Sequence, residues 1–253
     1  MVDAAINIIR NVNIENINFQ WYRSTLKANN GLKDTLDYGH AVLTSADQLD
    51  EYIYTYGLMI ESQWTHAVSI LGQIPQPDLL IDYGCGQGLA GVLLHDLAQN
   101  GIPDDVASIV LIEPSAMALA RAEALYRRLA PAAQIAAICK RFDDVEADDI
   151  LSAGESGSTL HIFSNSLDIP AFDALRLLER TLQPGLNTII SVSHDRAFNG
   201  GTPRIEAVKT ALEHPSMASD LTVLRSDFKQ FICSNAGQSK GVAWICGVEV
   251  TDG

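Results

Sequence analysis

A glycine-rich loop between an apolar run and an amphipathic stretch constrains this chain most. Residues 79–90 read LLIDYGCGQGLA, with glycine at every second position from Gly84 to Gly88. The apolar run predicts a buried strand, and the helical spacing of apolar residues over 89–98 predicts a helix. Glycine suits such a turn because the backbone bends sharply and comes close to a ligand. The helix start adds unpaired N–H groups and a positive dipole end, so we expect a loop that binds a nucleotide-type cofactor.

The spacing of the glycines narrows the choice of cofactor. A dinucleotide fingerprint requires Gly-x-Gly-x-x-Gly, but here Leu89 stands at the third glycine position and Gly88 comes one residue early. No Gly-Lys-Ser/Thr follows, which excludes a P-loop. Asp82 stands two residues before the first glycine, where it would repel a pyrophosphate but could meet a cationic or hydroxyl-bearing ligand. An enzyme that uses a nicotinamide nucleotide is the alternative within cofactor binding.

The run from Asp82 to Gly88, DYGCGQG, resembles the first motif of the class I S-adenosylmethionine-dependent methyltransferases, Asp/Glu-x-Gly-x-Gly-x-Gly. This resemblance implies an α/β fold with a doubly wound, mostly parallel seven-stranded sheet, whose seventh strand runs antiparallel. It implies S-adenosyl-L-methionine as the cofactor, with the acid and the glycine loop lining its methionine end. The cofactor residues expected in this loop are Asp82, Gly84, Cys85, Gly86 and Gly88.

A second group of cofactor residues is expected at the end of the next strand. Residues 107–112 predict that strand, and Glu113 follows it directly. One carboxylate can accept hydrogen bonds from both hydroxyls of a ribose, and the resemblance implies this role for Glu113. Pro114 then opens a helix that we expect over 116–129, because proline is favoured at the first helical turn.

A third strand is expected over 133–139, with Phe142 and Asp143 shortly after it. In the resembled family an acid here accepts a hydrogen bond from the adenine amino group, with an apolar neighbour against the ring. Asp143 and Phe142 match these two positions. The acid-rich run 143–149 equally suits an exposed helix start, where carboxylates interact well with the dipole. Both interpretations stay open.

Candidate catalytic residues follow the expected fourth and fifth strands, over 158–163 and 187–192. The fourth delivers Ser164, a cofactor contact, together with Asn165 and Asp168 to the carboxyl edge of the sheet, where ligands of open α/β sheets bind. Asn165 would position the acceptor and Asp168 is one candidate base, although Asp168 also suits a helix cap. His194, with Asp195 beside it, is the other candidate base. The Asn/Asp-Pro-Pro-aromatic run of some amino-methylating relatives is absent from this stretch.

The residues before the glycine loop predict helices rather than strands. We expect a helical N-terminal cap over 1–76 and the cofactor-binding domain over 77–253, which closes with strands over 228–233 and 242–250. The longest cap helix, capped by Ser45 or Asp47 and ending at Gly72, carries tyrosines at 52, 54 and 56. One buried stripe cannot hold all three, so we expect packing against the core or a lid over the substrate. The resemblance implies that Gln63 and Trp64 contact the methionine end.

The net charge limits which kinds of methyl acceptor the protein is expected to bind. The net charge of −14, from 31 acidic and 17 basic residues, favours a small molecule or a basic protein segment as methyl acceptor over bulk nucleic acid. An RNA methyltransferase with a local basic patch is an alternative. An example of such a patch is Arg121, Arg127, Arg128, Lys140 and Arg141, although we favour the interpretation that these are solvated helix and loop charges.

The function indicated is an S-adenosylmethionine-dependent methyltransferase of unknown acceptor. A relative that binds the cofactor, or nothing, and serves as an interaction module without turnover is the alternative from another class. We expect a cytoplasmic location, no membrane span and no metal site, because the four cysteines are scattered and have no histidine at metal-ligand spacing.

Overall fold

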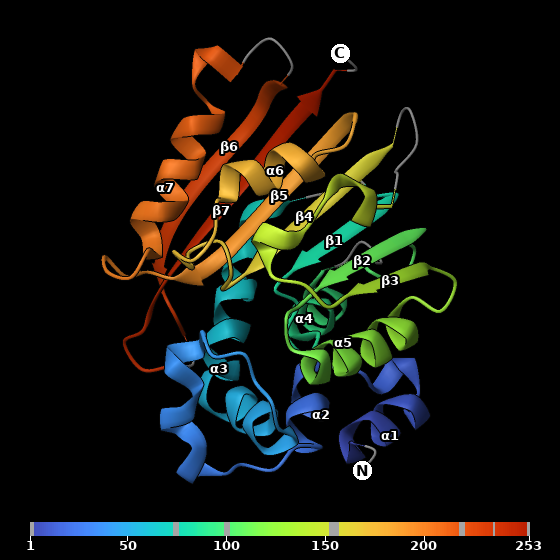
Figure 1. Ribbon diagram of the computed structural model, residues 1–253. Helices are drawn as coiled ribbons and strands as arrows, with labels where there is room; N and C mark the ends of the chain where they lie inside the picture. Colours follow the sequence, from blue (N-terminus) through green and yellow to red (C-terminus); the bar gives the residue numbers. More distant parts are fainter. Residues whose placement is uncertain are drawn as a thin grey trace.

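The computed structural model describes residues 3–72, 76–98, 102–151, 157–217, 221–234 and 236–251. Seven strands form one sheet in the order β3-β2-β1-β4-β5-β7-β6 (Figure 1). The first five strands run parallel, and β7 lies antiparallel between β5 and β6. This confirms the predicted α/β class and the mostly parallel, seven-stranded sheet with an antiparallel seventh strand.

The strand bounds follow the apolar runs of the sequence. β1 (Leu79–Tyr83) is an interior strand, buried along its whole length between β2 and β4. A strand covered on both faces reads as a continuous apolar run. The other strands are β2 (Ser108–Ile112), β3 (Gln134–Ile138), β4 (Ser158–Ser164), β5 (Gly185–His194), β6 (Leu221–Ile232) and β7 (Lys240–Val250).

The last two strands differ most from their prediction. β6 begins at Leu221, seven residues before the predicted start at Phe228, and β7 begins two residues early. β6 is an edge strand whose side chains are mostly half-buried or exposed on both faces. Its sequence therefore lacks the apolar alternation that marks a strand with one buried face.

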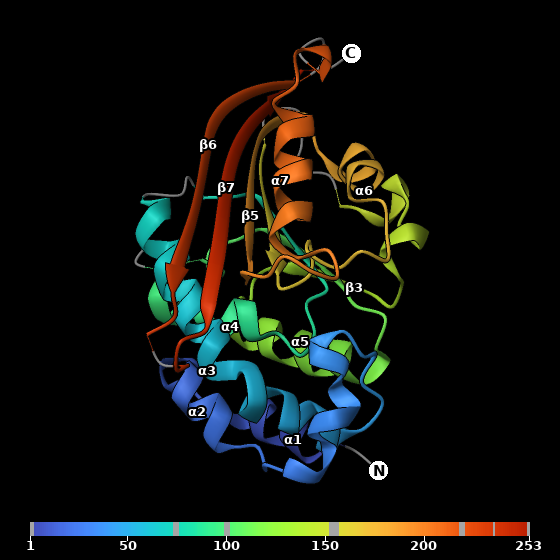
Figure 2. The same ribbon diagram turned by 90° about the vertical axis from the view of Figure 1, so that its left-hand side faces the viewer.

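Helices cover both faces of the sheet (Figure 2). α3 (Ala46–Leu71), α4 (Leu89–Leu97) and α5 (Ala116–Leu129) pack with Leu80, Leu111 and Ile162 on one face. α6 (Ala174–Thr181) and α7 (Gly201–Leu212) cover the other face of the sheet. There they pack with the strand residues that alternate with those of the first face. Side chains along a strand alternate between the two faces, so each strand contributes to both cores.

The N-terminal residues form the predicted helical cap. It consists of α1 (Ala4–Asn11), α2 (Phe19–Ser24), α3 and short 3₁₀ segments, of which Asn30–Gly39 is the longest. Ser45 caps α3 as predicted, with its Oγ accepting from the N–H of Gln48 at 3.2 Å, and Gly72 ends the helix with φ +64°. The cap lies at the carboxyl edge of the parallel strands and shares the α3–α5 core (Figure 1). Its division from 77–253 as a separate domain stays a prediction.

Two segments far apart in the chain thus meet at the topological switch point. The sheet order reverses between β1 and β4. The glycine loop leaves β1 there, and Ser164 to Asp168 leave β4 beside it. Open α/β sheets bind ligands in the crevice at this point.

Candidate functional site

The three loop glycines adopt left-handed conformations for different reasons. Their φ angles are +65° for Gly84, +51° for Gly86 and +86° for Gly88. A Cβ on Gly84 would come within 3.0 Å of Cβ of Ser166, and one on Gly88 within 3.0 Å of Cα of Ala122 in α5. A Cβ on Gly86 would meet no described atom within 4 Å. Close packing thus accounts for Gly84 and Gly88, whereas the space over Gly86 is open.

Glu113 lies next to this open space. Its Oε2 accepts from the N–H of Gly86 at 3.1 Å and its Oε1 accepts from the N–H of Ser115 at 2.8 Å. Burial raises the pKa of the Glu113 carboxyl, while these two backbone bonds act in the opposite direction. The carboxylate is therefore held in one orientation by the loop and by the start of α5.

A small cavity lies over the glycine loop, and we call it the loop cavity. Its volume is about 130 Å³. It is lined by the predicted cofactor residues Gly84, Gly86, Glu113, Pro114, Phe142 and Ser164. The opposite wall comes from the cap, chiefly from residues 39–43. The structure therefore brings six predicted cofactor residues to one cavity.

Four predicted cofactor residues lie elsewhere. Asp82 is fully buried, and its Oδ2 accepts a 2.8 Å hydrogen bond from the hydroxyl of Tyr126 in α5. Burial raises the pKa of Asp82 to about 7. Cys85 is buried and its thiol pKa lies well above the usual value, which disfavours a reactive thiolate. Gly88 packs on α5, and Asp143 is exposed and accepts from the N–H of Asp173 at 3.2 Å. Their contact with a cofactor stays a prediction.

A larger cavity adjoins the loop cavity, and we call it the tyrosine cavity. Its volume is about 560 Å³. The two cavities share Gly39, His40, Tyr52 and Asn165. Tyr52, Tyr54 and Tyr56 of α3 all contribute to its lining, as do the three predicted catalytic residues, Asn165, Asp168 and His194.

An ion pair lies at the sheet edge of the tyrosine cavity. Nη2 of Arg196 donates to Oδ2 of Asp168 at 2.8 Å, and the two side chains are only 8% and 4% exposed. The same nitrogen lies 2.7 Å from Nε2 of His40 in the cap. Sequence reasoning missed both Arg196, the partner of Asp168, and His40, which contacts Arg196. Arg196 could have been found from its position at the end of β5, whereas nothing in the sequence connects His40 with this edge.

His194 is half-buried at this edge. Burial and the neighbouring charge of Arg196 lower the pKa of His194, so the imidazole is neutral at pH 7. The predicted His194–Asp195 pair does not form among the described residues. Oδ1 of Asp195 instead accepts from Thr202 at 2.7 Å and from Gln230 at 3.1 Å. Side chains from the start of α7 and from β6 therefore bind the Asp195 carboxylate, which was expected to orient His194.

Asn165 stands where the two cavities meet. Its backbone is left-handed, with φ +55°, and its Nδ2 donates to Oε1 of Gln63 in α3 at 3.0 Å. The indole N–H of Trp64 donates to Oγ of Ser164 at 3.0 Å. Gln63 and Trp64 thus contact the last residue of β4 and the residue that follows it, and neither is among the residues that line the loop cavity.

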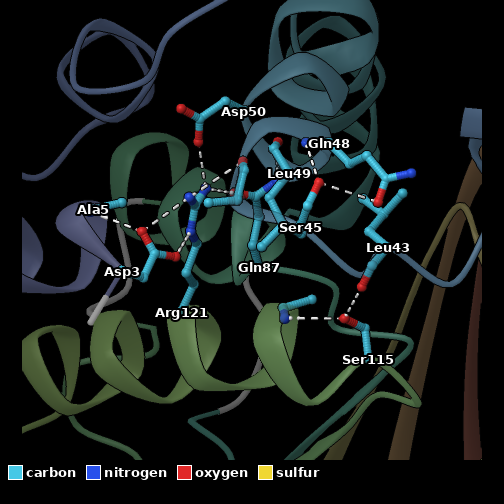
Figure 3. Close-up of polar contacts among 12 residues, drawn as sticks. Asp3, Ala5, Leu43, Ser45, Gln48, Leu49, Asp50, Gln87, Ser115 and Arg121 are labelled. Atoms are coloured by element: carbon cyan, nitrogen blue, oxygen red, sulfur yellow. Dashed lines mark hydrogen bonds and ion pairs between the residues drawn. The ribbon is translucent and has the colours of Figure 1, made fainter. Parts of the chain in front are cut away.

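A buried polar network joins the cap to the glycine loop (Figure 3). Arg121 of α5 is 1% exposed and forms ion pairs with Asp3 and Asp50 of the cap. Its Nη1 also donates to Oε1 of Gln87 at 3.0 Å, while Nε2 of Gln87 donates to the carbonyl of Leu49 at 2.7 Å. The loop residue between Gly86 and Gly88 is therefore fixed by the cap.

This network corrects the expectation that Arg121 is a solvated helix charge and also removes it from the alternative basic patch. Arg121 is not at the surface, because the carboxylates of Asp3, the N-cap of α1, and of Asp50 in α3 neutralise it in the interior. Arg127 pairs with Glu123 at 2.7 Å, and Lys140 pairs with Asp149 at 2.7 Å. Arg128 donates to the carbonyl of Val12. Burial and acidic neighbours, which linear spacing does not reveal, remove most of the free positive charge.

The described part of the chain contains no group of three or more His, Cys, Asp or Glu side chains placed to hold a metal ion. None of its described helices is both long enough and apolar enough to cross a membrane.

Among the comparisons with known proteins, only the comparison with solved structures found similar proteins. No family model matches the chain, and no curated protein matches it. The plantazolicin methyltransferase BpumL, solved with a pentazolic desmethylPZN analog and SAH, is similar at 13% identity and a TM-score of 0.45, covering 99% of this chain and 100% of that one. A geranyl diphosphate methyltransferase solved with SAM is similar at 13% identity and a TM-score of 0.42, covering 82% and 92%. At such low identities and scores, function has to be argued from this chain's own residues.

Proposed function

We propose that this protein transfers a methyl group from S-adenosyl-L-methionine to an acceptor that enters the tyrosine cavity. The observation that carries the proposal is the open space over Gly86. Packing does not fill that space, and the Glu113 carboxylate lies hydrogen-bonded to the same glycine. A cofactor that brings its ribose to Glu113 would lie against a backbone without a side chain.

The residues that line the loop cavity fit this cofactor. Glu113 would accept from the ribose hydroxyls, Phe142 would lie against the adenine, and Gly84 and Gly86 would lie beside the methionine end. When bound, S-adenosyl-L-methionine supplies a methyl group on a positively charged sulfur that leaves as a neutral thioether. The protein's own task is then to orient the acceptor and to take up its proton.

The size of the loop cavity adds a conformational requirement. About 130 Å³ is less than the roughly 300 Å³ that small-molecule sites provide at the low end. Residues 39–43 form the cap side of its wall, which begins at the last of three successive left-handed residues, Asp37, Tyr38 and Gly39. We therefore expect this cap segment, residues 37–43, to shift outward when the cofactor enters. Its closed position is held by the His40–Arg196 contact and by the hydroxyl of Ser115 on the carbonyl of Leu43.

Calorimetric titration tests the proposal. Purified protein is titrated with S-adenosyl-L-methionine and, separately, with NADH, and the titrations are repeated on Gly86→Val and Glu113→Ala. Glu123→Ala serves as the control, since Glu123 lies on the surface of α5 and pairs only with Arg127 among the described residues. We expect saturable binding of S-adenosyl-L-methionine alone, lost in both site variants and kept in the control.

Two other titration results would contradict the proposal. Binding of NADH alone would overturn the choice of cofactor in favour of a nicotinamide enzyme. Binding of neither would overturn the enzyme proposal and favour an interaction module.

A further inference from the structure

The tyrosine cavity has the size and place of an acceptor site. Its volume of about 560 Å³ lies within the range of small-molecule sites. It shares Gly39, His40, Tyr52 and Asn165 with the loop cavity, so a molecule inside it lies directly beside the loop cavity. The chemistry of its walls therefore limits which acceptors can bind.

The walls of the cavity are rich in aromatic rings from three parts of the chain. Tyr52 and Tyr56 of α3 lie with ring centroids 5.2 Å apart and an interplanar angle of 60°. Gly39 of the cap lies over them, and even a Cβ there would stay 3.6 Å from the Tyr52 ring. Tyr38 and Phe198, which are 83% and 65% exposed, line the cavity from the cap and from the loop before α7. Exposed rings of this kind favour a planar aromatic partner by stacking and edge-to-face contact.

The buried charges of the tyrosine cavity cancel. The Arg196 guanidinium is paired with Asp168, and both side chains are almost completely buried. An anionic acceptor would meet the Asp168 carboxylate, and a cationic acceptor would meet Arg196. Lys33 also lines the cavity, but it is exposed and its charge stays in contact with water. The buried part of the lining thus offers no net charge to compensate for desolvating a charged ligand.

One proton acceptor of the described lining lies outside the ion-pair cluster of His40, Arg196 and Asp168. His40 is engaged through its Nε2 with Arg196, and Asp168 is engaged through its Oδ2 with the same guanidinium. His194 lines the cavity, is neutral at pH 7, and has no side-chain hydrogen bond within the described ranges. A neutral imidazole can accept a proton from a hydroxyl or ring N–H during attack.

We infer that the acceptor is an uncharged, planar aromatic molecule with an ionisable O–H or N–H group, and that His194 accepts its proton. This inference rests on the proposed methyl transfer and names its substrate class. The acceptor's O–H or N–H bond breaks toward the imidazole, and its oxygen or nitrogen forms the new bond to the methyl carbon as the carbon–sulfur bond breaks. The imidazolium then releases the proton to water.

A matched ligand series tests the substrate class by binding alone. We would measure, by ligand-observed NMR and calorimetry, the binding of 2-naphthol, its 6-carboxylate, its 6-aminomethyl derivative and the saturated decahydro-2-naphthol. The expected result is that 2-naphthol binds at least about tenfold more tightly than the other three. Phe198→Ala should weaken 2-naphthol binding, whereas Leu224→Ala, an exposed residue of β6 outside the lining, should not. Equal or tighter binding of a charged or saturated member would overturn the inference.

The role of His194 has a separate readout. His194→Gln should bind 2-naphthol as the wild type does but form S-adenosylhomocysteine more slowly, and the acidic limb of the pH–rate profile should disappear. An unchanged pH profile would overturn the role of His194. Binding of S-adenosyl-L-methionine without preference for 2-naphthol would overturn the substrate class and leave the methyltransferase proposal intact. Preference for 2-naphthol without cofactor binding would overturn the methyltransferase proposal instead.

Discussion

Arg121 donates a 3.0 Å hydrogen bond through Nη1 to Oε1 of Gln87, and this contact ties the helical cap to the glycine loop. The guanidinium is neutralised by Asp3 of the N-terminal segment and Asp50 of α3. The hydroxyl of Tyr22 donates to the same Gln87 oxygen at 2.9 Å. The glycine loop is thereby held in place by three segments of the cap, which contribute Asp3, Tyr22 and Asp50.

Loss of Arg121 should destabilise the protein and weaken the cofactor site. Arg121→Ala leaves two mostly buried carboxylates without their partner, which costs about 3–5 kcal/mol in the free energy of unfolding. Arg127→Ala, in the same helix but 56% exposed, should change it by less than about 0.5 kcal/mol. Urea unfolding followed by circular dichroism measures both. Equal stability of the two variants would contradict the described burial of Arg121.

Gly86 and Gly88 should respond differently to alanine. Gly86→Ala adds a Cβ in open space, so it costs about 1–2 kcal/mol for the left-handed backbone and its main effect should be weaker binding of S-adenosyl-L-methionine. Gly88→Ala adds the contact with Ala122 and should cost roughly 1–3 kcal/mol more through overpacking. Thermal unfolding and calorimetry separate the two effects. If Gly86→Ala bound the cofactor normally, the open space would not be a ligand site.

The His40–Arg196 contact should slow cofactor entry. His40→Ala removes a bond that holds the cap segment over the loop cavity, so the association rate constant for S-adenosyl-L-methionine should rise. Lys33→Ala is the matched control, since Lys33 lines the tyrosine cavity but not the loop cavity. Stopped-flow fluorescence with purified protein measures both rates. A rate unaffected by His40→Ala would mean that this contact does not hold the segment closed.

Asp82 should make stability fall as the pH rises. Its folded-state pKa of about 7 lies above the ordinary value of 3.8, because burial disfavours the charged form. The folded state therefore holds the proton more tightly, and this contribution, complete below pH 3.8, is lost as the pH rises through 7. Relative to Asp82→Asn, the wild type should lose about 3 kcal/mol of unfolding free energy between pH 5 and pH 8.

Urea denaturation of both proteins at the two pH values checks this difference. Other titrating groups contribute equally to both proteins and cancel. A constant difference across the range would show that Asp82 stays ionised throughout, as a carboxylate exposed to a ligand site would.

Residue patterns predicted the loop cavity better than the tyrosine cavity. The strand–glycine loop–helix unit and Glu113 are local features, because a short apolar run, its turn and the residue after it fix their own geometry. Phe142 was predicted to line the cofactor site and does line the loop cavity. The burial of Asp82 in β1 could not be predicted from spacing, since it depends on packing against Tyr126 of α5.

The sequence by itself determined the α/β class, the parallel strands and the place of the glycine loop, because hydrophobic period and turn chemistry act over a few neighbouring residues. Only the tertiary structure decided which charges are free. Arg121 was expected near the surface and lies in an internal ion pair, and Arg196 and His40, 156 residues apart, meet over a cavity that no local pattern marks. Burial and pairing across such distances depend on how helices pack on the sheet, and a linear pattern carries no direct measure of that packing.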